Sequence, residues 1–297
     1  MKRATVFAPG SVGNVGPGFD ILGLAIDGIG DRVTVEVGKS GPVVVRGRDA
    51  ELVPTDPAKN AAAIAARAMT DQPLQVTIDK GLPVSAGLGG SAASSVAGAY
   101  AAAIACEITA TPSSIMLAAL EGEIAVSGRH LDNIAPITLG GLALSRSIDP
   151  IDVIALKAPE NWSIALVTPN VRIETKKARA ILPEKWERDQ WIQQMANATA
   201  LVVAFMTADT ALVRRSLDDL YAEPRRAPMI PHFADVKRAA LDAGAFGCSI
   251  SGSGPTIFAL CDTSTAKDCA EAMRKAMAEV QCEVRVSGIA RQGAHPV

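Results

Sequence analysis

The sequence predicts a fold that mixes helices with strands and divides near the middle of the chain. With 297 residues, of which 48% are hydrophobic and 20% charged, the chain is long enough for one large domain or for two modest ones that share a cleft. Short alternating or apolar runs, typical of strands, are interspersed with longer capped or alanine-rich runs, typical of helices. The segment 148–161 contains Pro150 and Pro159 and is the best candidate for a boundary between two halves.

The elements of the first half are predicted from short, well-separated patterns. Alternating valines indicate a strand at Arg32–Val37, and Asn60 is placed to cap the helix that follows it. In chain order we expect strands at 4–8, 32–37, 43–46, 74–78 and 142–145, and helices at 60–69, 92–105 and from Thr111 or Ser113 to Val126.

For the second half, the sequence predicts fewer strands and more helices than for the first half. Pro224 lies within 222–226, and this segment is expected to be a break. The strands are expected at 163–168, 257–261 and 283–287, and the helices at 175–182, 190–205, 210–220, from His232 or Asp235 to Ala243, and 265–280.

Composition excludes several classes of protein. The net charge is −2 and the densest basic cluster is only Arg225-Arg226, so nothing indicates a nucleic-acid partner. No apolar run approaches the roughly 20 residues of a membrane-spanning helix, and no signal peptide is evident. The five cysteines are odd in number and form no Cys-x-x-Cys pair, which favours free thiols in a reducing compartment and no zinc site. We therefore expect a cytoplasmic protein.

The most informative stretch is Pro83–Ser95, where three glycines in four residues precede small hydroxyl residues and an alanine-rich helix. A glycine-rich loop that leads into a helix N-terminus directs free N–H groups and the positive dipole end at one point, which favours a phosphate. No Gly-Lys-Ser/Thr follows, so this is not a Walker A loop, and no dinucleotide fingerprint is present. An ordinary loop with a helix cap is the alternative.

Three further stretches carry polar or glycine-rich patterns. The turn-rich segment 9–20 offers Asn14 and Asp20, which are either ligands or turn formers. Segment 121–141 places Glu123 on a helix before a His-x-Asp-Asn turn, although a solvated helix end with an Asx turn would look similar. Segment 244–256 is glycine-rich and is either a plain turn between strands or part of a site.

These stretches resemble the motifs of a known family. The pattern Pro-x-x-x-Gly-Leu-Gly-(Ser/Gly)-Ser-Ala-Ala resembles the ATP-phosphate loop of the GHMP small-molecule kinases, with Gly90 at the usual serine position. Segment 8–20 is similar to the Ala-Pro-x-Ser-x-x-Asn-x-Gly-Pro-Gly-Phe-Asp motif of the homoserine kinases, a branch of that family, with Gly13 and Val15 in place of alanine and leucine. The His-x-Asp-Asn region matches the same branch, and Ile-Ser-Gly-Ser-Gly-Pro-Thr resembles the third GHMP motif, which lies against the first.

The resemblance spans almost the whole chain and implies a fold and an activity. The fold class would be α+β, with an N-terminal GHMP domain at 1–155 that carries the nucleotide loop and a ferredoxin-like C-terminal domain at 156–297. The activity would be phosphorylation of the side-chain hydroxyl of L-homoserine by MgATP, a step towards threonine, with a homodimer suggested by analogy. A GHMP kinase for another small alcohol and a non-catalytic ligand-binding module stay open as alternatives.

The resemblance also implies roles for particular residues. Asn14 and Asn133 would orient the substrate hydroxyl, with His130 close by, and Asp132 is a candidate base. We expect Asn133 to act without a base, because a loose phosphoryl-transfer transition state requires little deprotonation of the nucleophile.

Ligands for the ends of an amino acid and for MgATP are implied in the same way. Asp20 would hold the ammonium group, and Arg179 and Arg226 the carboxylate, whereas Arg225 is expected to form a surface salt bridge. Ser91 and Glu123 would bind Mg²⁺. The ATP-binding loop comprises Pro83, Val84, Ser85, Ala86, Gly87, Leu88, Gly89, Gly90, Ser91, Ala92 and Ala93.

Overall fold

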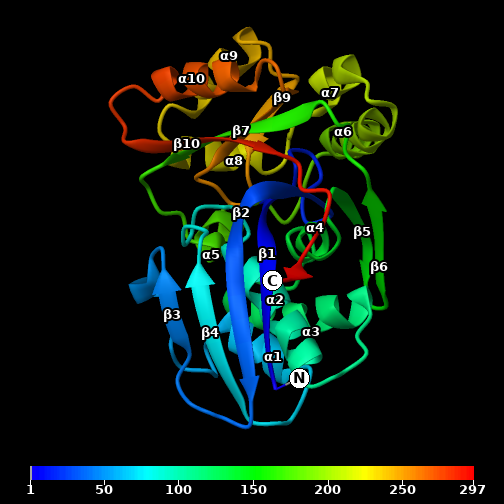
Figure 1. Ribbon diagram of the computed structural model, residues 1–297. Helices are drawn as coiled ribbons and strands as arrows, with labels where there is room; N and C mark the ends of the chain where they lie inside the picture. Colours follow the sequence, from blue (N-terminus) through cyan, green and yellow to red (C-terminus); the bar gives the residue numbers. More distant parts are fainter. Residues whose placement is uncertain (1) are drawn as a thin grey trace.

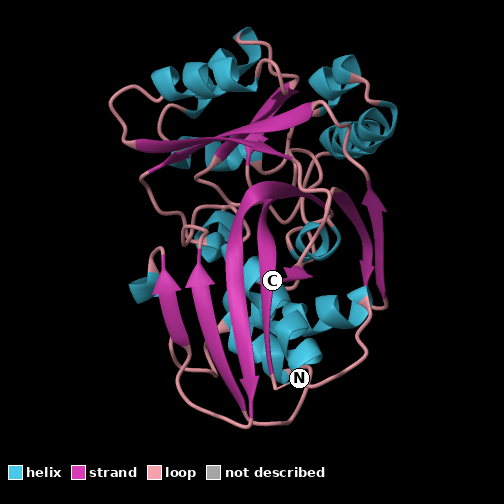
Figure 2. Cartoon of the chain, viewed as in Figure 1, coloured by secondary structure: helices cyan, strands magenta, loops and turns pink. Residues whose placement is uncertain are grey.

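The computed structural model describes residues 2–297 and shows two sheets, each covered by helices. In Figure 1 the larger sheet lies below and the smaller one above, and loops from both converge where the two meet. Figure 2 shows the same view by secondary structure, with a helical layer behind the larger sheet and another above the smaller one. Within the described residues, no helix combines the length and the apolarity needed to cross a bilayer.

The larger sheet is organised around one long strand, β2. It pairs with β1 along most of its length, with β4 at its C-terminal part and with β5 at its N-terminal part, so that the strand order is β11-β1-β2-β4-β3 with the β5–β6 hairpin attached to β2. Among the strands of residues 2–297, only β3 and β4 pair in parallel. The strands are β1 (Arg3–Gly13), β2 (Leu22–Val37), β3 (Val44–Gly47), β4 (Leu74–Lys80), β5 (Leu142–Ile148), β6 (Ile151–Leu156) and β11 (His295–Pro296).

The helices of this half pack on one face of the larger sheet. Helix α2 lies at the centre of the layer because nearly all its side chains are small and buried, which lets α1 and α3 approach it closely. Asn60 caps α1 as expected, and Thr111 caps α3 in a capping box with Ser114. The helices are α1 (Ala61–Arg67), α2 (Gly90–Ala105), α3 (Pro112–Val126) and α4 (Ile134–Leu139), with a 3₁₀ turn, η1, at Ala50–Leu52.

The smaller sheet has the antiparallel strand order β10-β7-β9-β8, the 4-1-3-2 arrangement of a ferredoxin-like fold. Helices α9 and α10 bury a second hydrophobic core against it. The strands are β7 (Trp162–Pro169), β8 (Gly247–Ile250), β9 (Ile257–Asp262) and β10 (Cys282–Gly288). The helices are α5 (Thr175–Ala180), α6 (Arg188–Thr207), α7 (Thr210–Ser216), α8 (Glu223–Arg226), η2 (Ala227–Met229), α9 (Phe233–Asp242) and α10 (Ala266–Ala276).

The structure departs from the sequence-based elements in several places. Residues 9–13, expected in a loop, continue β1 through a bulge, because their backbone pairs with β2. Segment 148–161 contains β6, which forms a hairpin with β5. The expected break at 222–226 is the single helical turn α8, in which Pro224 occupies the first turn, where no intrahelical N–H is required. The sequence patterns missed α4, β8, β11 and the N-terminal part of β2 altogether.

The C-terminus returns to the first half, since β11 pairs with β1 in the larger sheet. A division of the chain at 155/156 stays a prediction. All five cysteines are free thiols, of which Cys106 and Cys282 are only half-buried.

Candidate active site

A cleft of about 430 Å³ opens where the two halves meet, and it brings the separate motifs together. Most of the predicted site residues line it, including every predicted substrate, catalytic and metal residue. Three residues of the predicted ATP loop do not, because their side chains are buried in the core instead: Leu88, Ala92 and Ala93. The cleft also extends to Leu52, Val53 and Pro54, an apolar wall that sequence reasoning missed because no motif marks it.

The glycine-rich stretch forms a tight loop at the N-terminus of α2, and we call residues 83–91 the phosphate loop. Gly89 caps the helix with φ 68°, a left-handed conformation that favours glycine. A Cβ atom at this position would lie 3.1 Å from Asn133 Oδ1, so the loop backbone directly adjoins the His-x-Asp-Asn segment. Ser251 donates a hydrogen bond of 2.6 Å to the carbonyl oxygen of Gly87, so the third glycine-rich stretch lies against the phosphate loop. The Gly252 N–H donates to the Gly13 carbonyl oxygen at 3.0 Å, so the same stretch also contacts the N-terminal segment.

A buried ionic cluster of Asp31, Lys80 and Ser94 anchors the phosphate loop to the larger sheet. Sequence reasoning missed this cluster. The Asp31 carboxylate accepts hydrogen bonds from the backbone N–H groups of Gly81 and Leu82, at 3.0 and 3.1 Å, and from the Ser94 hydroxyl at 2.7 Å. It also pairs with the Lys80 ammonium group, which donates to the Gly90 carbonyl oxygen as well. One carboxylate thus fixes both the entry of the loop and the first turn of α2. No local pattern singles out Asp31, which lies between Gly30 and Arg32.

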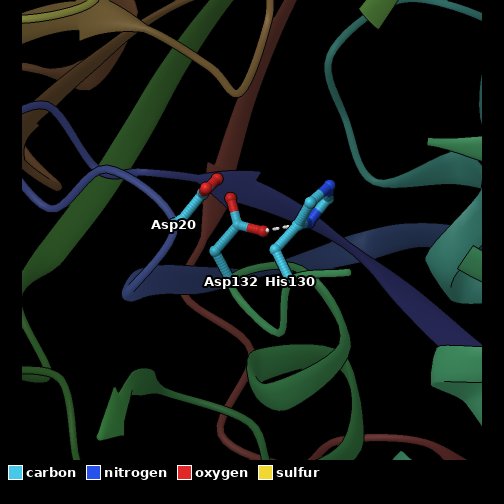
Figure 3. Close-up of side chains that lie close together, drawn as sticks. All are labelled: Asp20, His130 and Asp132. Carbon is cyan, nitrogen blue, oxygen red and sulfur yellow. Dashed lines mark hydrogen bonds and ion pairs between the residues drawn. The ribbon is translucent and has the colours of Figure 1, made fainter. Parts of the chain in front are cut away.

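Asp132 is the centre of a hydrogen-bonded corner of the cleft. Its Oδ1 pairs with His130 Nδ1 at 2.9 Å and accepts from Asn133 Nδ2 at 3.1 Å, while its Oδ2 accepts from the Asn14 backbone N–H at 3.2 Å. Ser11, which is fully buried, donates to Asn133 Oδ1 at 2.8 Å. Figure 3 shows the Asp20 and Asp132 carboxylates facing each other, with His130 on the far side of Asp132.

The backbone of the N-terminal motif approaches this corner very closely. A Cβ atom at Gly13 would lie 2.6 Å from Asp132 Oδ2, so glycine at this position permits the contact. Asn14 and Val15 then adopt left-handed conformations, with φ 65° and 46°, which is strained for a β-branched valine. The Asn14 side chain holds the turn, because it donates to the Gly252 carbonyl oxygen at 3.0 Å and accepts from the Asp20 N–H at 3.0 Å.

His130 is electrostatically coupled to the carboxylates around it. Burial disfavours the charged imidazolium, but the hydrogen bond and charge of Asp132, together with the charge of Asp20, raise the pKa of His130 to about 9. The ring is therefore protonated near neutral pH. Its Nε2 is buried and has no hydrogen-bond partner among residues 2–297. A protonated ring cannot ligate a metal, so the cluster of Asp20, His130 and Asp132 suits an organic cation better than a metal ion.

Glu123 lies on α3 and faces the N-terminus of α2. Its Oε2 accepts a 2.6 Å hydrogen bond from Ser127, whereas its Oε1 is buried without a partner in the described part of the chain. Burial raises the pKa of Glu123 above its usual value, although the Ser127 and Ser91 hydroxyls oppose the shift. A buried carboxylate oxygen without a partner, close to a serine hydroxyl, fits an oxygen-liganded divalent cation such as Mg²⁺.

The opposite end of the cleft holds the two arginines, which reach it from the second half. Arg179 on α5 forms a bidentate ion pair with Asp20, at 2.8 and 2.7 Å. Arg226 on α8 is buried and donates to the carbonyl oxygens of Ala178 and Gly252. Both guanidinium groups lie over the Phe19 ring, at 5.2 and 5.5 Å from its centroid. We call Asp20, Arg179 and Arg226 the zwitterion site.

Arg225 does not form the surface salt bridge expected from the sequence. It is half-buried and donates to the carbonyl oxygens of Leu220 and Tyr221, because α8 turns its side chain back along the preceding loop.

Two domain families match the chain. The family model described as "GHMP kinases N terminal domain" matches residues 57–141, and "GHMP kinases C terminal" matches residues 201–279. The fold, the glycine-rich loop at α2 and the ferredoxin-like second half are thus those of a GHMP kinase. Mevalonate diphosphate decarboxylase from Staphylococcus aureus, at 14% identity and a TM-score of 0.70, shares this fold.

Closer relatives narrow the family further. The chain is 41% identical to a homoserine kinase of Chloroherpeton thalassium, over 94% of this chain and 92% of the relative, and 38% identical to one of Chlorobium phaeobacteroides, over 99% of both. It also superposes on the crystal structure of homoserine kinase from Cytophaga hutchinsonii with a TM-score of 0.94 and 39% identity, covering 100% of this chain and 98% of that one. The chain therefore belongs to the homoserine kinase family of the GHMP kinases.

Proposed function

We propose that this protein transfers the γ-phosphoryl group of ATP to the side-chain hydroxyl of L-homoserine, giving O-phospho-L-homoserine for threonine synthesis. One observation carries the proposal: an unbroken series of contacts leads from the phosphate loop to the zwitterion site. Gly89 adjoins Asn133, Asn133 bonds to Asp132, and Asp132 lies beside Asp20, which pairs with Arg179. A short amino acid bound at one end therefore presents its hydroxyl near the phosphates bound at the other. The relatives' activity supports the same assignment.

ATP fits the part of the cleft around α2. The phosphate loop and the N-terminus of α2 present N–H groups and a positive dipole end, which stabilise phosphate oxygens without a lysine of the P-loop type. The apolar wall of Leu52, Val53 and Pro54 offers a surface for the nucleobase. In this arrangement the phosphate chain runs along the loop towards Asn133.

Ser91 and Glu123 would hold Mg²⁺ through one hydroxyl and one carboxylate oxygen, the hard oxygen ligands that this ion prefers. The ion supplies charge neutralisation on the phosphates when it is bound. Glu123 suits this role because its unpartnered oxygen is already desolvated, so binding a cation relieves an existing cost.

At the other end, Asp20 binds the ammonium group and the two arginines bind the carboxylate, as planar guanidinium groups do well. Asn133 orients the hydroxyl. Asp132 does not act as a base, since it already receives bonds from His130, Asn133 and the Asn14 backbone. A loose transition state makes such positioning sufficient.

An ADP-release assay tests the proposal across L-homoserine, L-threonine, L-serine, mevalonate and galactose with MgATP. We expect the highest kcat/KM with L-homoserine, because only it combines the zwitterion with a hydroxyl at the right distance. Turnover of mevalonate or a sugar, with none of L-homoserine, would move the protein to another branch of the family.

A further inference from the structure

The Asp20–Arg179 ion pair has the same chemistry as the bond proposed between Arg179 and the substrate carboxylate. A carboxylate already occupies the guanidinium fork with two parallel hydrogen bonds, at 2.8 and 2.7 Å. Asp20 comes from the loop after β1, whereas Arg179 lies on α5 of the second half. In this structure, the two groups assigned to opposite ends of the substrate therefore pair with each other.

We propose that substrate binding is an exchange of ion pairs, in which Asp20 releases Arg179 to the substrate carboxylate and itself takes the substrate ammonium group. This inference rests on the proposed function and deepens it. The exchange leaves no charge unpaired: the single Asp20–Arg179 pair is replaced by two pairs, Asp20 with the substrate ammonium group and Arg179 with the substrate carboxylate. Asp20 thereby acts as a specificity-determining residue that competes with any carboxylate for Arg179.

The surroundings allow the exchange without rearrangement of the core. The side chains of Arg179 and Asp20 are 39% and 31% exposed, so water and solute reach the pair. Arg226, by contrast, is buried and tied to two backbone carbonyl oxygens, which makes it the stationary member of the zwitterion site. The Phe19 ring contacts both guanidinium groups through cation–π interactions, so it holds Arg179 near the site after the ion pair with Asp20 has broken.

The exchange predicts strong discrimination against ligands that carry only one of the two charges. A carboxylate without an ammonium group leaves Asp20 unpaired close to Asp132, and two carboxylates at that distance repel each other. An amine without a carboxylate leaves Arg179 unpaired beside Arg226, whose pKa is lowered by burial and then by the charge of Arg179. Only a zwitterion satisfies both released groups, so its two ends bind cooperatively.

The decisive ligand is 4-hydroxybutyrate, which is homoserine without its amino group. Isothermal titration calorimetry is performed on the wild-type chain and on Asp20→Asn, which removes the competing charge and keeps the shape. We expect Asp20→Asn to bind 4-hydroxybutyrate about 10-fold more tightly than wild type, in the range of one charge-assisted bond, and L-homoserine at least about 10-fold more weakly. Glu174→Gln is the matched control, because Glu174 lines the same cleft but pairs with Lys177. It should leave 4-hydroxybutyrate binding within about 2-fold of wild type, as expected for an exposed pair.

If a folded Asp20→Asn variant binds 4-hydroxybutyrate as tightly as wild type or more weakly, the exchange is wrong. It is also wrong if Asp20→Asn and Glu174→Gln both bind 4-hydroxybutyrate more tightly than wild type. A second measurement uses wild type alone and covers a variant that fails to fold. Methylammonium should pair with the released Asp20 and tighten 4-hydroxybutyrate binding several-fold compared with KCl at the same ionic strength, and no difference between the salts contradicts the exchange. Failure of the proposed function is separate, since it appears as absent ADP release with L-homoserine in wild type.

Discussion

At the phosphate-loop end of the cleft, the loop is anchored by backbone groups and by fully buried side chains, whereas two of the three zwitterion-site side chains, Asp20 and Arg179, are partly exposed. Asp31 and Lys80 are 0% and 4% exposed and anchor the loop within one half. Arg179 and Asp20 are about a third exposed and pair across the halves. The comparison indicates a rigid site for a reactant common to the whole family and an adjustable site for the reactant that differs between branches.

The largest effect is expected at the rigid end, from Glu123→Gln. The variant keeps the size of the side chain but removes the charge proposed to hold Mg²⁺, so we expect kcat to fall by roughly two orders of magnitude or more. Raised Mg²⁺ should restore part of the loss in steady-state assays. Unchanged activity would place the metal elsewhere in the cleft.

Asn133 lies where the two ends meet, and its replacement by alanine tests positioning. We expect kcat/KM to fall about 10- to 1000-fold, the range for losing one positioned polar group. Asp132→Asn should lose less activity, because Asp132 is not needed as a base. If Asp132→Asn is inactive while it still folds and binds both substrates, Asp132 is the general base after all.

At the adjustable end, Arg179→Lys and Arg226→Lys retain charge but lose the planar fork. We expect KM for L-homoserine to rise about 10-fold while KM for ATP changes little, because one bidentate contact is lost. Arg225→Lys is the matched control, since Arg225 contacts only backbone carbonyl oxygens among the interactions that the structure records for it. Equal increases in both KM values would assign the arginines to the fold or to ATP.

The smallest expected effect concerns stability and depends on pH through His130. Its pKa is raised from 6.5 to about 9, so folding favours the protonated ring. The resulting stabilisation is fully present below about pH 6.5 and is lost as pH rises through about 9, with a magnitude on the order of 3 kcal/mol. Urea unfolding at pH 6 and pH 10 should therefore show a larger decrease for wild type than for His130→Gln. Parallel decreases would show that His130 is not coupled to the carboxylates.

The contrast between the two ends also explains what could be predicted from the sequence. The phosphate loop is contiguous in the chain, so its glycines and hydroxyl residues mark a candidate phosphate site, and the resemblance to the GHMP motif favours it over an ordinary capped loop. The pairing of Asp20 with Arg179 could not be predicted, because 159 positions separate the two residues and only the packing of the halves brings them together. The role of Phe19 beneath both arginines depends on the same packing.

The secondary structure could likewise be predicted only where local sequence patterns determine it. Capped or alternating segments such as α1 and the C-terminal part of β2 follow local rules and were predicted. By contrast, α4 and β6 are stabilised by burial and pairing with distant residues, which no local pattern reveals. Asp31 was missed for a related reason, since its four hydrogen-bonding partners come from β4, from the two residues that lead into the phosphate loop, and from α2.

The central claim is that the two ends of the cleft cooperate to phosphorylate the hydroxyl of L-homoserine. Phosphorus NMR of the reaction with MgATP and L-homoserine tests it most directly, because the product itself is observed. We expect a new phosphomonoester resonance that grows in step with ADP, and none when 4-hydroxybutyrate replaces L-homoserine at the same concentration. ADP formed with inorganic phosphate alone, or an equal phosphomonoester signal from 4-hydroxybutyrate, would contradict it.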